Sequence, residues 1–373
     1  MKILVVNNYF PEHIGGIEFA AYNLVSMFRR NHTVHWMASD VEQNPHVAST
    51  DDVPLRSLNF TETHLGFPYP IPVLASYPCV IHEVIWCDII HLHDCLYAVN
   101  IIVYILSRIF KKPVLITQHI SPVPYRQAYK NRLQAIAYGT IGKLLLTHSE
   151  EVVFISQRVL EWFVGQLHLN TRPNLILNGV DHRLFHPVQN NERKGIRKQL
   201  QLPDDRPVIV FVGRFTEKKG LDMIREAAER AQRYLWVLIG RVDGLDPRDW
   251  KLANIKVIPP LSQSELRKYY VASDLLALPS IGEGIPLALQ EAMSCGTPAV
   301  VSDEIYGTLP DAPLLKLVDN CASSLLLTID HYFSIPEEIG NWRMNVCNYA
   351  QSHWSWEAAG NSYENLFLRL KHG

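Results

Sequence analysis

The stretch SIGEGIPLALQEAMSCGTPAVVSD (residues 280–303) determines how we interpret the rest of the chain. Gly284 and Pro286 predict a tight loop that opens a helix, because proline suits the first helical position. The helix is apolar and leads through CGTP into the buried strand PAVVS (298–302). A loop, a helix and a second apolar strand in this order are typical of one repeating unit of a parallel α/β sheet.

Two carboxylates in this stretch lack a neighbouring cation in the sequence. Glu283 falls in the predicted loop and Glu291 in the helix, and no Lys or Arg lies between Lys268 and Lys316. A carboxylate can accept paired hydrogen bonds, which matches the vicinal hydroxyls of a ribose or a sugar ring. The alternative is a pair of ordinary surface glutamates. The apolar flanks favour a role in ligand binding.

Along the whole chain, short apolar runs alternate with segments whose apolar residues recur at the spacing of an α-helix. This βαβ rhythm predicts an α/β fold with parallel sheets covered on both faces. We expect strands at 2–10, 32–39, 87–93, 113–119, 151–156, 174–179, 208–213, 235–240, 255–258, 274–280 and 298–302. The polar segment 187–207 separates the two series and suggests a linker with one short surface helix. The sequence therefore predicts two doubly wound, Rossmann-like domains, 1–186 and 187–355.

Composition limits the class of protein. The chain has 373 residues, 47% of them hydrophobic, and a net charge of −2. This charge argues against a nucleic-acid partner, which would favour a strongly basic chain. The N-terminus lacks the long apolar region of a signal peptide, and the apolar run 96–106 is about half of the ~20 residues that a spanning helix needs. We therefore expect a cytoplasmic location.

Cysteine and histidine crowd together between residues 79 and 95. Three of the six cysteines lie there, beside His91 and His93. Their spacing fits no structural zinc pattern. We expect the cysteines to be free thiols that pack as small buried residues, and the two histidines to pack or hydrogen-bond internally.

A basic turn follows the strand 208–213. Arg214 and Lys219 lie five residues apart in VGRFTEKKG (212–220), where a strand turns into a helix. Fixed cations at a helix N-terminus make an anion site, because backbone N–H groups add to the charge. Lys218 is expected to be solvated. No GxGxxG follows a strand and no P-loop occurs, and there is no Asp-x-Asp pair for a metal–diphosphate clamp.

Three residues of the first domain are weaker candidates. Gly15 and Gly16 precede the first helix, where glycine would let a ligand approach the backbone closely. His119 ends the strand 113–119, at the edge of the sheet where ligands bind. A single histidine at a strand end has either a structural or a ligand-binding role, and the sequence leaves both open.

Together these motifs resemble the retaining glycosyltransferases of family 4, which have the GT-B fold of two Rossmann-like domains facing each other across a cleft. The most specific element is the E-x7-E motif formed by Glu283 and Glu291, followed by AMSCGTPAVVS. GRFTEKKG, GGIE (15–18), DIIHLHD (88–94) and NGVD (178–181) also fit. The resemblance implies that the C-terminal helix, about 356–373, packs back on the first domain. After PAVVSD the chain departs from the family, since EIYGTLPDA replaces a glycine-rich turn.

The resemblance also implies roles for individual residues. Arg214 and Lys219 would bind the diphosphate of a nucleotide-sugar, Glu291 its ribose and Glu283 the sugar hydroxyls. His119 would contact the transferred sugar. Backbone groups would complete the donor site at Gly15, Gly16, Gly284, Ile285, Pro286 and Leu287. The set with a direct part in catalysis would be His119, Glu283, Arg214 and Lys219, with no metal and no cofactor.

The implied activity is a hexosyltransferase that retains configuration and uses a UDP- or GDP-sugar as donor. Its acceptor would be lipid-linked or a glycan, in cell-surface polysaccharide or glycolipid biosynthesis. Three alternatives stay open at this point: a nicotinamide-dependent two-domain oxidoreductase, a non-catalytic sugar-binding protein, and an epimerase or phosphorylase with the GT-B fold.

A basic segment in the first domain suggests a membrane contact. Between Cys95 and Ser149 there are seven Lys or Arg and no Asp or Glu, and the cations adjoin apolar and aromatic residues. The alternative is a solvated basic face beside a buried helix. We expect Arg126, Lys130 and Arg132 to lie on a face that docks peripherally on the anionic cytoplasmic leaflet.

Overall fold

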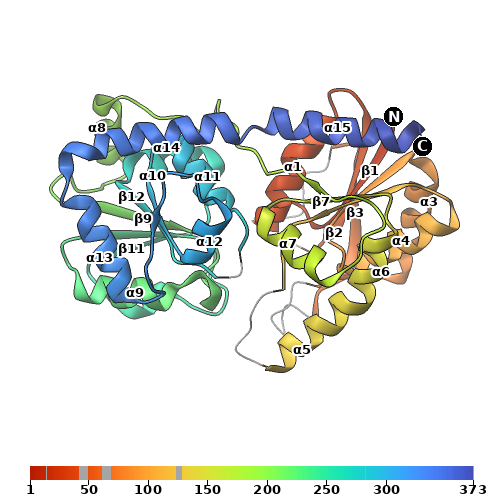
Figure 1. The fold of residues 1–373 in the computed structure, drawn as a ribbon, viewed down its shortest axis with the longest axis horizontal. Helices are drawn as coiled ribbons and strands as arrows, with labels where there is room; N and C mark the ends of the chain where they lie inside the picture. Colours follow the sequence, from red (N-terminus) through yellow and green to blue (C-terminus); the bar gives the residue numbers. More distant parts are fainter. Residues whose placement is uncertain (14, 42–48, 61–68, 123–127, 282, 373) are drawn as a thin grey trace. The chain divides into compact units, whose positions relative to one another are not determined.

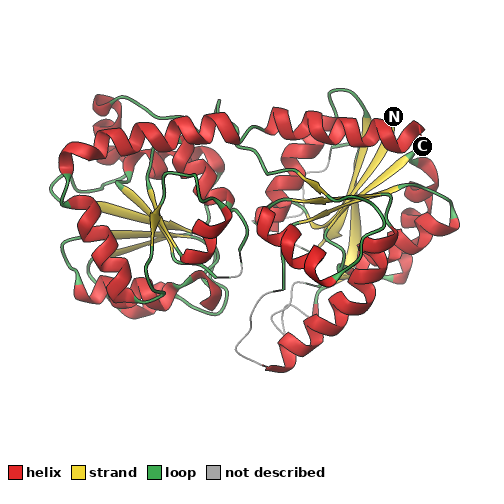
Figure 2. Ribbon diagram, viewed as in Figure 1, coloured by secondary structure: helices red, strands yellow, loops and turns green. Residues whose placement is uncertain are grey.

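The structure is a computed structural model that describes residues 1–13, 15–41, 49–60, 69–122, 128–281 and 283–372. The chain forms two compact units (Figure 1): unit 1 is Met1–Asn178 with Trp356–Gly373, and unit 2 is Gly179–Ser355. Each unit is a sheet of mostly parallel strands surrounded by helices, as Figure 2 shows. The α/β prediction with two Rossmann-like domains is confirmed.

The sheet of unit 1 has the order β4-β3-β2-β1-β5-β6-β7-β8 in the described residues. All neighbouring strands are parallel except β3 and β4. The strands are β1 (Lys2–Tyr9), β2 (Thr33–Asp40), β3 (Asp52–Leu58), β4 (Ile71–Pro72), β5 (Ile89–His93), β6 (Val114–Gln118), β7 (Glu151–Phe154) and β8 (Asn174–Leu175). The strand order reverses direction between β1 and β5, so ligands of this unit are expected beyond the carboxyl ends of these two strands.

The two faces of this sheet differ in chemistry because successive side chains of a strand point to opposite sides. On β5, Ile90 and Leu92 belong to the apolar core, whereas His91 and His93 point to the other face. His91 is buried there and its Nε2 lies 2.8 Å from Thr117 Oγ1. The prediction that both histidines hydrogen-bond internally is confirmed, since His93 Nδ1 lies 2.8 Å from His119 Nε2.

Helices cover both faces of unit 1. Right-handed crossovers place α3, α4 and α5–α6 on one face and α1 on the other. The helices are α1 (Gly16–Phe28), α3 (Tyr77–Trp86), α4 (Ala98–Ile109), α5 (Ala128–Ala137), α6 (Lys143–His148), α7 (Gln157–Gln166) and α15 (Trp356–His372). The C-terminal helix α15 packs on α1, where Phe367 meets Phe28 with ring centroids 4.9 Å apart. Tyr363 of α15 also lies 2.9 Å from Thr117, hydroxyl to hydroxyl.

The sheet of unit 2 is parallel and has the order β11-β10-β9-β12-β13-β14 in the described part of the chain. Its strands are β9 (Val208–Val212), β10 (Leu235–Ile239), β11 (Ile255–Ile258), β12 (Leu275–Leu278), β13 (Ala299–Val301) and β14 (Leu315–Lys316). Its helices are α8 (Asn190–Gln199), α9 (Leu221–Arg230), α10 (Gln263–Ala272), α11 (Leu287–Ser294), α12 (Asp303–Thr308), α13 (Ala322–Phe333) and α14 (Ile339–His353). The order reverses between β9 and β12, which carry the predicted donor residues at their carboxyl ends.

The compact units divide between Asn178 and Gly179, earlier than the expected boundary between 186 and 187. The reason is that the residues just after Asn178 pack against the rest of unit 2. Val180 forms a parallel bridge with Ser355, and the Phe185 ring lies 6.1 Å from that of Tyr270. The structure also adds β3, β4 and β14, which the apolar pattern did not predict because they are short or largely solvent-facing.

The cysteines divide into two groups. Cys87, Cys95, Cys295 and Cys347 are buried, as expected for small core residues. Cys79 and Cys321 are exposed, so the prediction of burial is wrong for them. Cys321 instead precedes α13, and its sulfur accepts a hydrogen bond from the Ser324 N–H at 3.4 Å.

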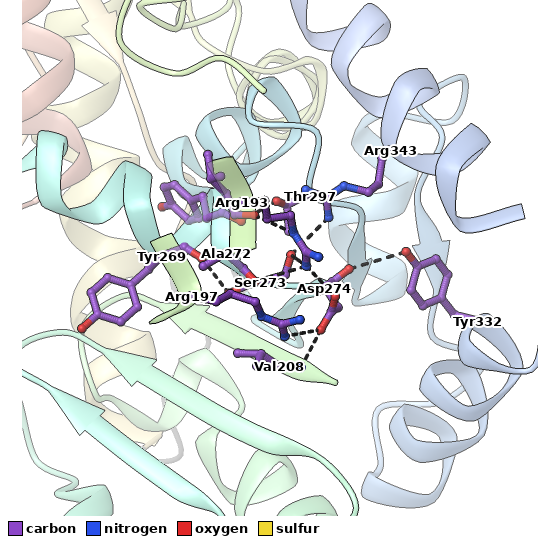
Figure 3. Close-up of polar contacts among 12 residues, drawn as sticks. Arg193, Arg197, Val208, Tyr269, Ala272, Ser273, Asp274, Thr297, Tyr332 and Arg343 are labelled. Atoms are coloured by element: carbon purple, nitrogen blue, oxygen red, sulfur yellow. Dashed lines mark hydrogen bonds and ion pairs between the residues drawn. The ribbon is translucent and has the colours of Figure 1, made fainter. Parts of the chain in front are cut away.

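The predicted surface linker contains a helix that is anchored by buried charge. Arg197 of α8 is almost fully buried, and its guanidinium lies 2.8 Å from Asp274 Oδ2. Arg193 of the same helix bonds Asp274 Oδ1 at 2.5 Å and three carbonyls at the end of α10 (Figure 3). Asp274 also accepts from the Val208 N–H at 2.8 Å. One carboxylate therefore joins α8 to the starts of β9 and β12.

We expect Asp274→Asn to destabilise unit 2 by about 3 kcal/mol, because it leaves two largely buried guanidinium groups without a counter-charge. Urea unfolding followed by tryptophan fluorescence measures the loss. Glu226→Gln is the matched control, since Glu226 pairs with Arg230 at the surface and the change should alter stability by less than about 1 kcal/mol. Equal losses in the two variants would contradict the anchoring role of Asp274.

Candidate functional site

The basic turn of unit 2 follows β9, next to the point where the strand order reverses. Arg214 comes directly after the strand end, and the short helix Glu217–Lys219 leads into α9. Gly220 joins the two with a left-handed φ of 71°. A Cβ at this position would lie 2.4 Å from the Pro279 carbonyl oxygen, so only glycine fits there. The turn is thus packed against the end of β12.

The loop that carries Glu283 is joined to this turn. The Ile281 N–H donates to the Lys218 carbonyl at 2.8 Å, and Lys219 Nζ forms an ion pair with Glu283 Oε1. The sequence predicted no cation for Glu283, and this expectation is wrong. Lys219 is remote in the chain, and the neighbouring strands β9 and β12 bring the two residues together.

Electrostatics keep Glu283 ionised. Burial raises the pKa of its carboxyl, but Lys219 and Lys218 outweigh burial and hold the pKa below its usual value. Glu283 Oε2 is buried and has no hydrogen-bond partner within the described protein. A buried, charged oxygen without a donor is costly unless a ligand supplies one. Glu283 can therefore accept a hydrogen bond from a ligand hydroxyl while Lys219 holds its other oxygen.

Lys218 belongs to the same charge cluster, although it was expected to be solvated. Its side chain is half-buried, and burial lowers the pKa of its amine to about 8. The charges that act on it are those of Glu283, Lys219, Arg214 and Asp243. Three cations thus surround two carboxylates at one edge of the sheet. Such a cluster attracts an anionic ligand.

Asp243 is a residue that sequence reasoning missed. It follows β10, and its Oδ2 lies 3.4 Å from Arg214 Nη1. The sequence signal was available, since β10 is the strand beside β9 and polar residues after its end must meet the same edge. Gly240 permits this approach, because a Cβ there would lie 1.8 Å from the Gly213 carbonyl oxygen.

Glu291 occupies α11 and is held by a neighbouring helix. Its Oε2 accepts from the Tyr270 hydroxyl of α10 at 2.9 Å. Burial raises the pKa of Glu291 to about 7, and the bond from Tyr270 limits this rise. The expectation that no local Lys or Arg pairs with Glu291 is confirmed. The expectation that Glu291 is free of protein partners is wrong, because Tyr270 bonds it. The helix itself begins after Pro286, which precedes the first turn rather than occupying it. Ile285 is buried beside this start, and Gly284 and Leu287 flank it.

The predicted residues of unit 1 lie at the carboxyl ends of β1 and β6. Gly15 precedes α1, and a Cβ there would lie 2.0 Å from a carboxylate oxygen of Glu18, so a side chain would displace that acid. At Gly16 a Cβ would meet no atom within 4 Å. His119 is buried, and burial lowers the pKa of its imidazole to about 3, so the ring is neutral at physiological pH.

Asp94 is a second residue that sequence reasoning missed, although DIIHLHD ends on it. It follows β5 with a left-handed φ of 68°, which is strained for a residue other than glycine. Its Oδ1 accepts from the His119 N–H at 3.3 Å, while Oδ2 is buried without a partner among the described residues. Burial raises its pKa to about 7. Asp94 therefore places a buried carboxyl oxygen without a partner among the described residues next to His119, at the carboxyl end of β5.

The residues of the predicted membrane face divide into three cases. Arg126 lies outside the described residues. Lys130 of α5 is half-buried, and Arg132 of α5 is exposed. Within the described ranges, none of the helices combines the length and the apolar character needed to cross a membrane.

Each of the two units matches a known protein family. The family described as "Glycosyltransferase Family 4" matches residues 14–184, and "Glycosyl transferases group 1" matches residues 192–310. Among curated proteins, D-inositol 3-phosphate glycosyltransferase of Mycobacterium tuberculosis is 33% identical in an alignment of 159 residues that covers 37% of this chain. The match spans about a third (32%) of the length of that relative.

Solved structures share the fold over nearly the full chain. Sucrose-phosphate synthase from Thermosynechococcus elongatus has a TM-score of 0.80 at 20% identity and covers 99% of both chains. HepE from Anabaena, in complex with UDP-glucose, has a TM-score of 0.75 at 16% identity and covers 99% of this chain and 100% of its own. Both family matches favour a glycosyltransferase over the oxidoreductase and sugar-binding alternatives. With the E-x7-E residues and the cation turn at the reversal point of unit 2, the chain belongs to the family-4-like glycosyltransferases of the GT-B fold.

Proposed function

We propose that this protein transfers a hexose from a UDP- or GDP-sugar to a hydroxyl acceptor, with retention of configuration and without a metal ion. One observation carries the proposal. Glu283 is held ionised by Lys219, with its second oxygen buried and unpaired, inside a cluster that also contains Arg214 and Lys218. Such a site matches a ligand that presents hydroxyls next to a diphosphate. The UDP-glucose complex of HepE supports the same donor class.

The chemistry follows from where charge develops. The bond between C1 of the sugar and the diphosphate oxygen breaks, and its electron pair stays on the phosphate. Arg214 and Lys219 stabilise the negative charge on this phosphate. That charge is larger in the transition state than in the bound donor, so the two cations stabilise the transition state more. The acceptor oxygen attacks C1 on the same face and gives its proton to the departing phosphate. This route retains configuration and needs no protein nucleophile.

In this proposal the two carboxylates bind different parts of the donor. Glu283 accepts from hydroxyls of the sugar, and Glu291 accepts from the ribose. His119 contacts the transferred sugar as a neutral imidazole, and the backbone at Gly15, Gly16 and 284–287 completes the site. Because Lys219 already pairs with Glu283, donor binding requires the lysine to share its charge between carboxylate and phosphate. Lys218 and Arg214 supply the remaining positive charge.

For acceptor and location we extend the proposal to a lipid-linked or glycan acceptor in cell-surface polysaccharide or glycolipid biosynthesis. The enzyme would work in the cytoplasm, peripherally on the anionic leaflet. The absence of acidic residues between Cys95 and Ser149 supports this location, and so do the cations Lys130 and Arg132.

Arg214→Ala and Lys219→Ala should each lower kcat/KM by about 30- to 1000-fold, which corresponds to roughly 2–4 kcal/mol of transition-state stabilisation. Steady-state kinetics with UDP- and GDP-sugars measure the loss, and EDTA should leave the wild-type rate unchanged. Lys194→Ala is the control, because Lys194 is an exposed cation of unit 2 on α8.

Lys219→Ala also leaves Glu283 unpaired, and a double variant separates the two effects. Adding Glu283→Gln to Lys219→Ala removes the unpaired charge and should restore stability. It should not restore binding of UDP or GDP, because the diphosphate still lacks its lysine. Normal turnover in Arg214→Ala or Lys219→Ala would refute the diphosphate role.

Nucleotide binding should depend on the ionisation of Glu291. If the ribose hydroxyls donate to its carboxylate, a pKa of about 7 makes UDP or GDP affinity about tenfold lower at pH 6 than at pH 8. Glu291→Gln should weaken binding at pH 8 and remove this difference, as measured by calorimetry. Glu265→Gln, on the surface of α10, is the control and should keep the wild-type profile. A Gln variant with the wild-type pH profile would exclude Glu291 as the titrating group.

The same shift predicts a change in stability. A carboxyl whose folded pKa is raised above its unfolded value loses stability as pH rises from the unfolded toward the folded pKa. The wild-type protein should therefore lose more stability than Glu291→Gln between pH 5 and pH 7, the range below the folded pKa of about 7. Urea unfolding at both pH values tests this, and parallel losses in the two proteins would contradict the shift.

A further inference from the structure

Two hydrogen bonds between buried side chains join β5 to β6 and the residue that follows it. His91 Nε2 lies 2.8 Å from Thr117 Oγ1, and His93 Nδ1 lies 2.8 Å from His119 Nε2. Each contact is diagonal, because the strand register pairs His93 directly with Thr117. The first contact leads on to the Tyr363 hydroxyl of α15, 2.9 Å from Thr117 Oγ1. The second ends on His119, which the proposed function places against the transferred sugar.

Both rings of the second contact are neutral. Burial lowers the pKa of the His93 imidazole well below its usual value, and the neighbouring histidines lower it further. Burial also lowers the pKa of His119 to about 3. A neutral imidazole carries one N–H and one nitrogen that accepts. The bond between the two rings therefore needs the proton on one of the two facing nitrogens, and the tautomer of His93 determines that of His119.

The surroundings of His93 favour one of the two arrangements. Its other ring nitrogen, Nε2, is buried without a hydrogen-bond partner in the described part of the chain. A proton on Nε2 would leave a buried N–H without an acceptor, whereas a proton on Nδ1 leaves only a lone pair unpaired. Among buried backbone groups, an N–H without an acceptor is rarer than an acceptor with a free lone pair. The same preference places the proton of His93 on Nδ1, facing His119.

Packing alone does not account for an imidazole at position 93. The neighbouring strand positions carry the apolar residues Ile90 and Leu92, which fill the core on the other face. A buried ring with an unpaired nitrogen costs stability relative to such a residue. The backbone on both sides of the contact is also held in place. Asn100 Nδ2 donates to the His93 carbonyl at 2.6 Å, and the His119 N–H donates to Asp94 Oδ1 at 3.3 Å.

We propose that His93 is a positioning residue, whose Nδ1–H donates to His119 Nε2 and holds His119 in the tautomer that carries its proton on Nδ1. This inference rests on the proposed function, in which His119 contacts the transferred sugar. Because Nε2 of His119 is occupied by His93, Nδ1 is the ring nitrogen left for a ligand. His119 then donates a hydrogen bond to a sugar oxygen, whereas the ionised Glu283 accepts one from a sugar hydroxyl.

Nitrogen-15 NMR of the full chain with labelled histidine tests the tautomer without any ligand. The shifts of a neutral imidazole distinguish its protonated nitrogen from the other, and the His119 signals are assigned by their loss in His119→Gln. In the wild type His119 should be protonated on Nδ1 and not on Nε2. His93→Leu should shift His119 toward a mixture of both tautomers. A wild-type His119 protonated on Nε2 would overturn the proposal, and so would unchanged His119 signals in His93→Leu.

Two variants of nearly equal shape separate the hydrogen bond from packing. His93→Asn keeps an N–H near the place of Nδ1, and His93→Leu does not. By calorimetry, His93→Leu should bind UDP-glucose or GDP-glucose about tenfold more weakly than the wild type and bind UDP or GDP normally. His93→Asn should recover most of the lost affinity. Equal losses in the Asn and Leu variants would overturn the role of the N–H.

Tyr363→Phe is the matched control. It removes a buried hydrogen bond on the same face of the sheet without touching His119. This variant should lose stability in urea unfolding but keep the His119 signals and the affinity for the nucleotide-sugar. If His93→Leu does not fold, the tautomer of the wild-type protein decides by itself. A wild-type protein with the expected tautomer that binds neither nucleotide-sugar nor nucleotide would contradict the proposed function and leave the placement of the proton by His93 intact.

Discussion

The ion pair between Lys219 and Glu283 is the contact on which the proposed donor site of unit 2 depends. It connects the loops that follow β9 and β12, the two strands between which the sheet reverses its order. The bond from Ile281 to the Lys218 carbonyl and the close packing of Gly220 against Pro279 hold the same two loops together. The cations and the carboxylate are therefore fixed before any ligand arrives, and little reorganisation is needed as charge develops.

The buried strands, the residues of the E-x7-E motif and those of the basic turn after β9 could be predicted from the sequence, because their signals are local. A buried parallel strand is a short apolar run, and a cation after its end must lie at the edge of the sheet. The partners of those residues could not be predicted in the same way. Lys219 and Glu283 meet only because β9 and β12 are neighbours, and α8 buries Arg197 only because Asp274 lies beneath it. A polar segment such as 187–207 carries no sign of a distant buried counter-charge, so it was expected to be a surface linker.

Buried acids with raised pKa values occur in both units. Asp94 and Glu291 each have a pKa of about 7 because burial disfavours their charged forms. Near neutral pH each therefore lowers the stability of the fold relative to a neutral residue of the same shape. Active sites commonly retain such groups at a cost in stability, which agrees with the ligand-binding role that we propose for these two edges of the sheets. The strained backbone of Asp94 points the same way.

Helix α15 gives the chain an unusual order of completion during synthesis. Its Tyr363 and Phe367 fill the face of the unit 1 sheet beside Thr117 and Phe28, and Arg369 reaches Glu151 at 3.1 Å. These residues are synthesised after all of unit 2. That face of the unit 1 sheet is therefore covered by α1 without α15 until unit 2 has been synthesised. Unit 1 is therefore completed only after unit 2, and a nascent chain that has not yet made α15 would expose an apolar surface to which chaperones can bind.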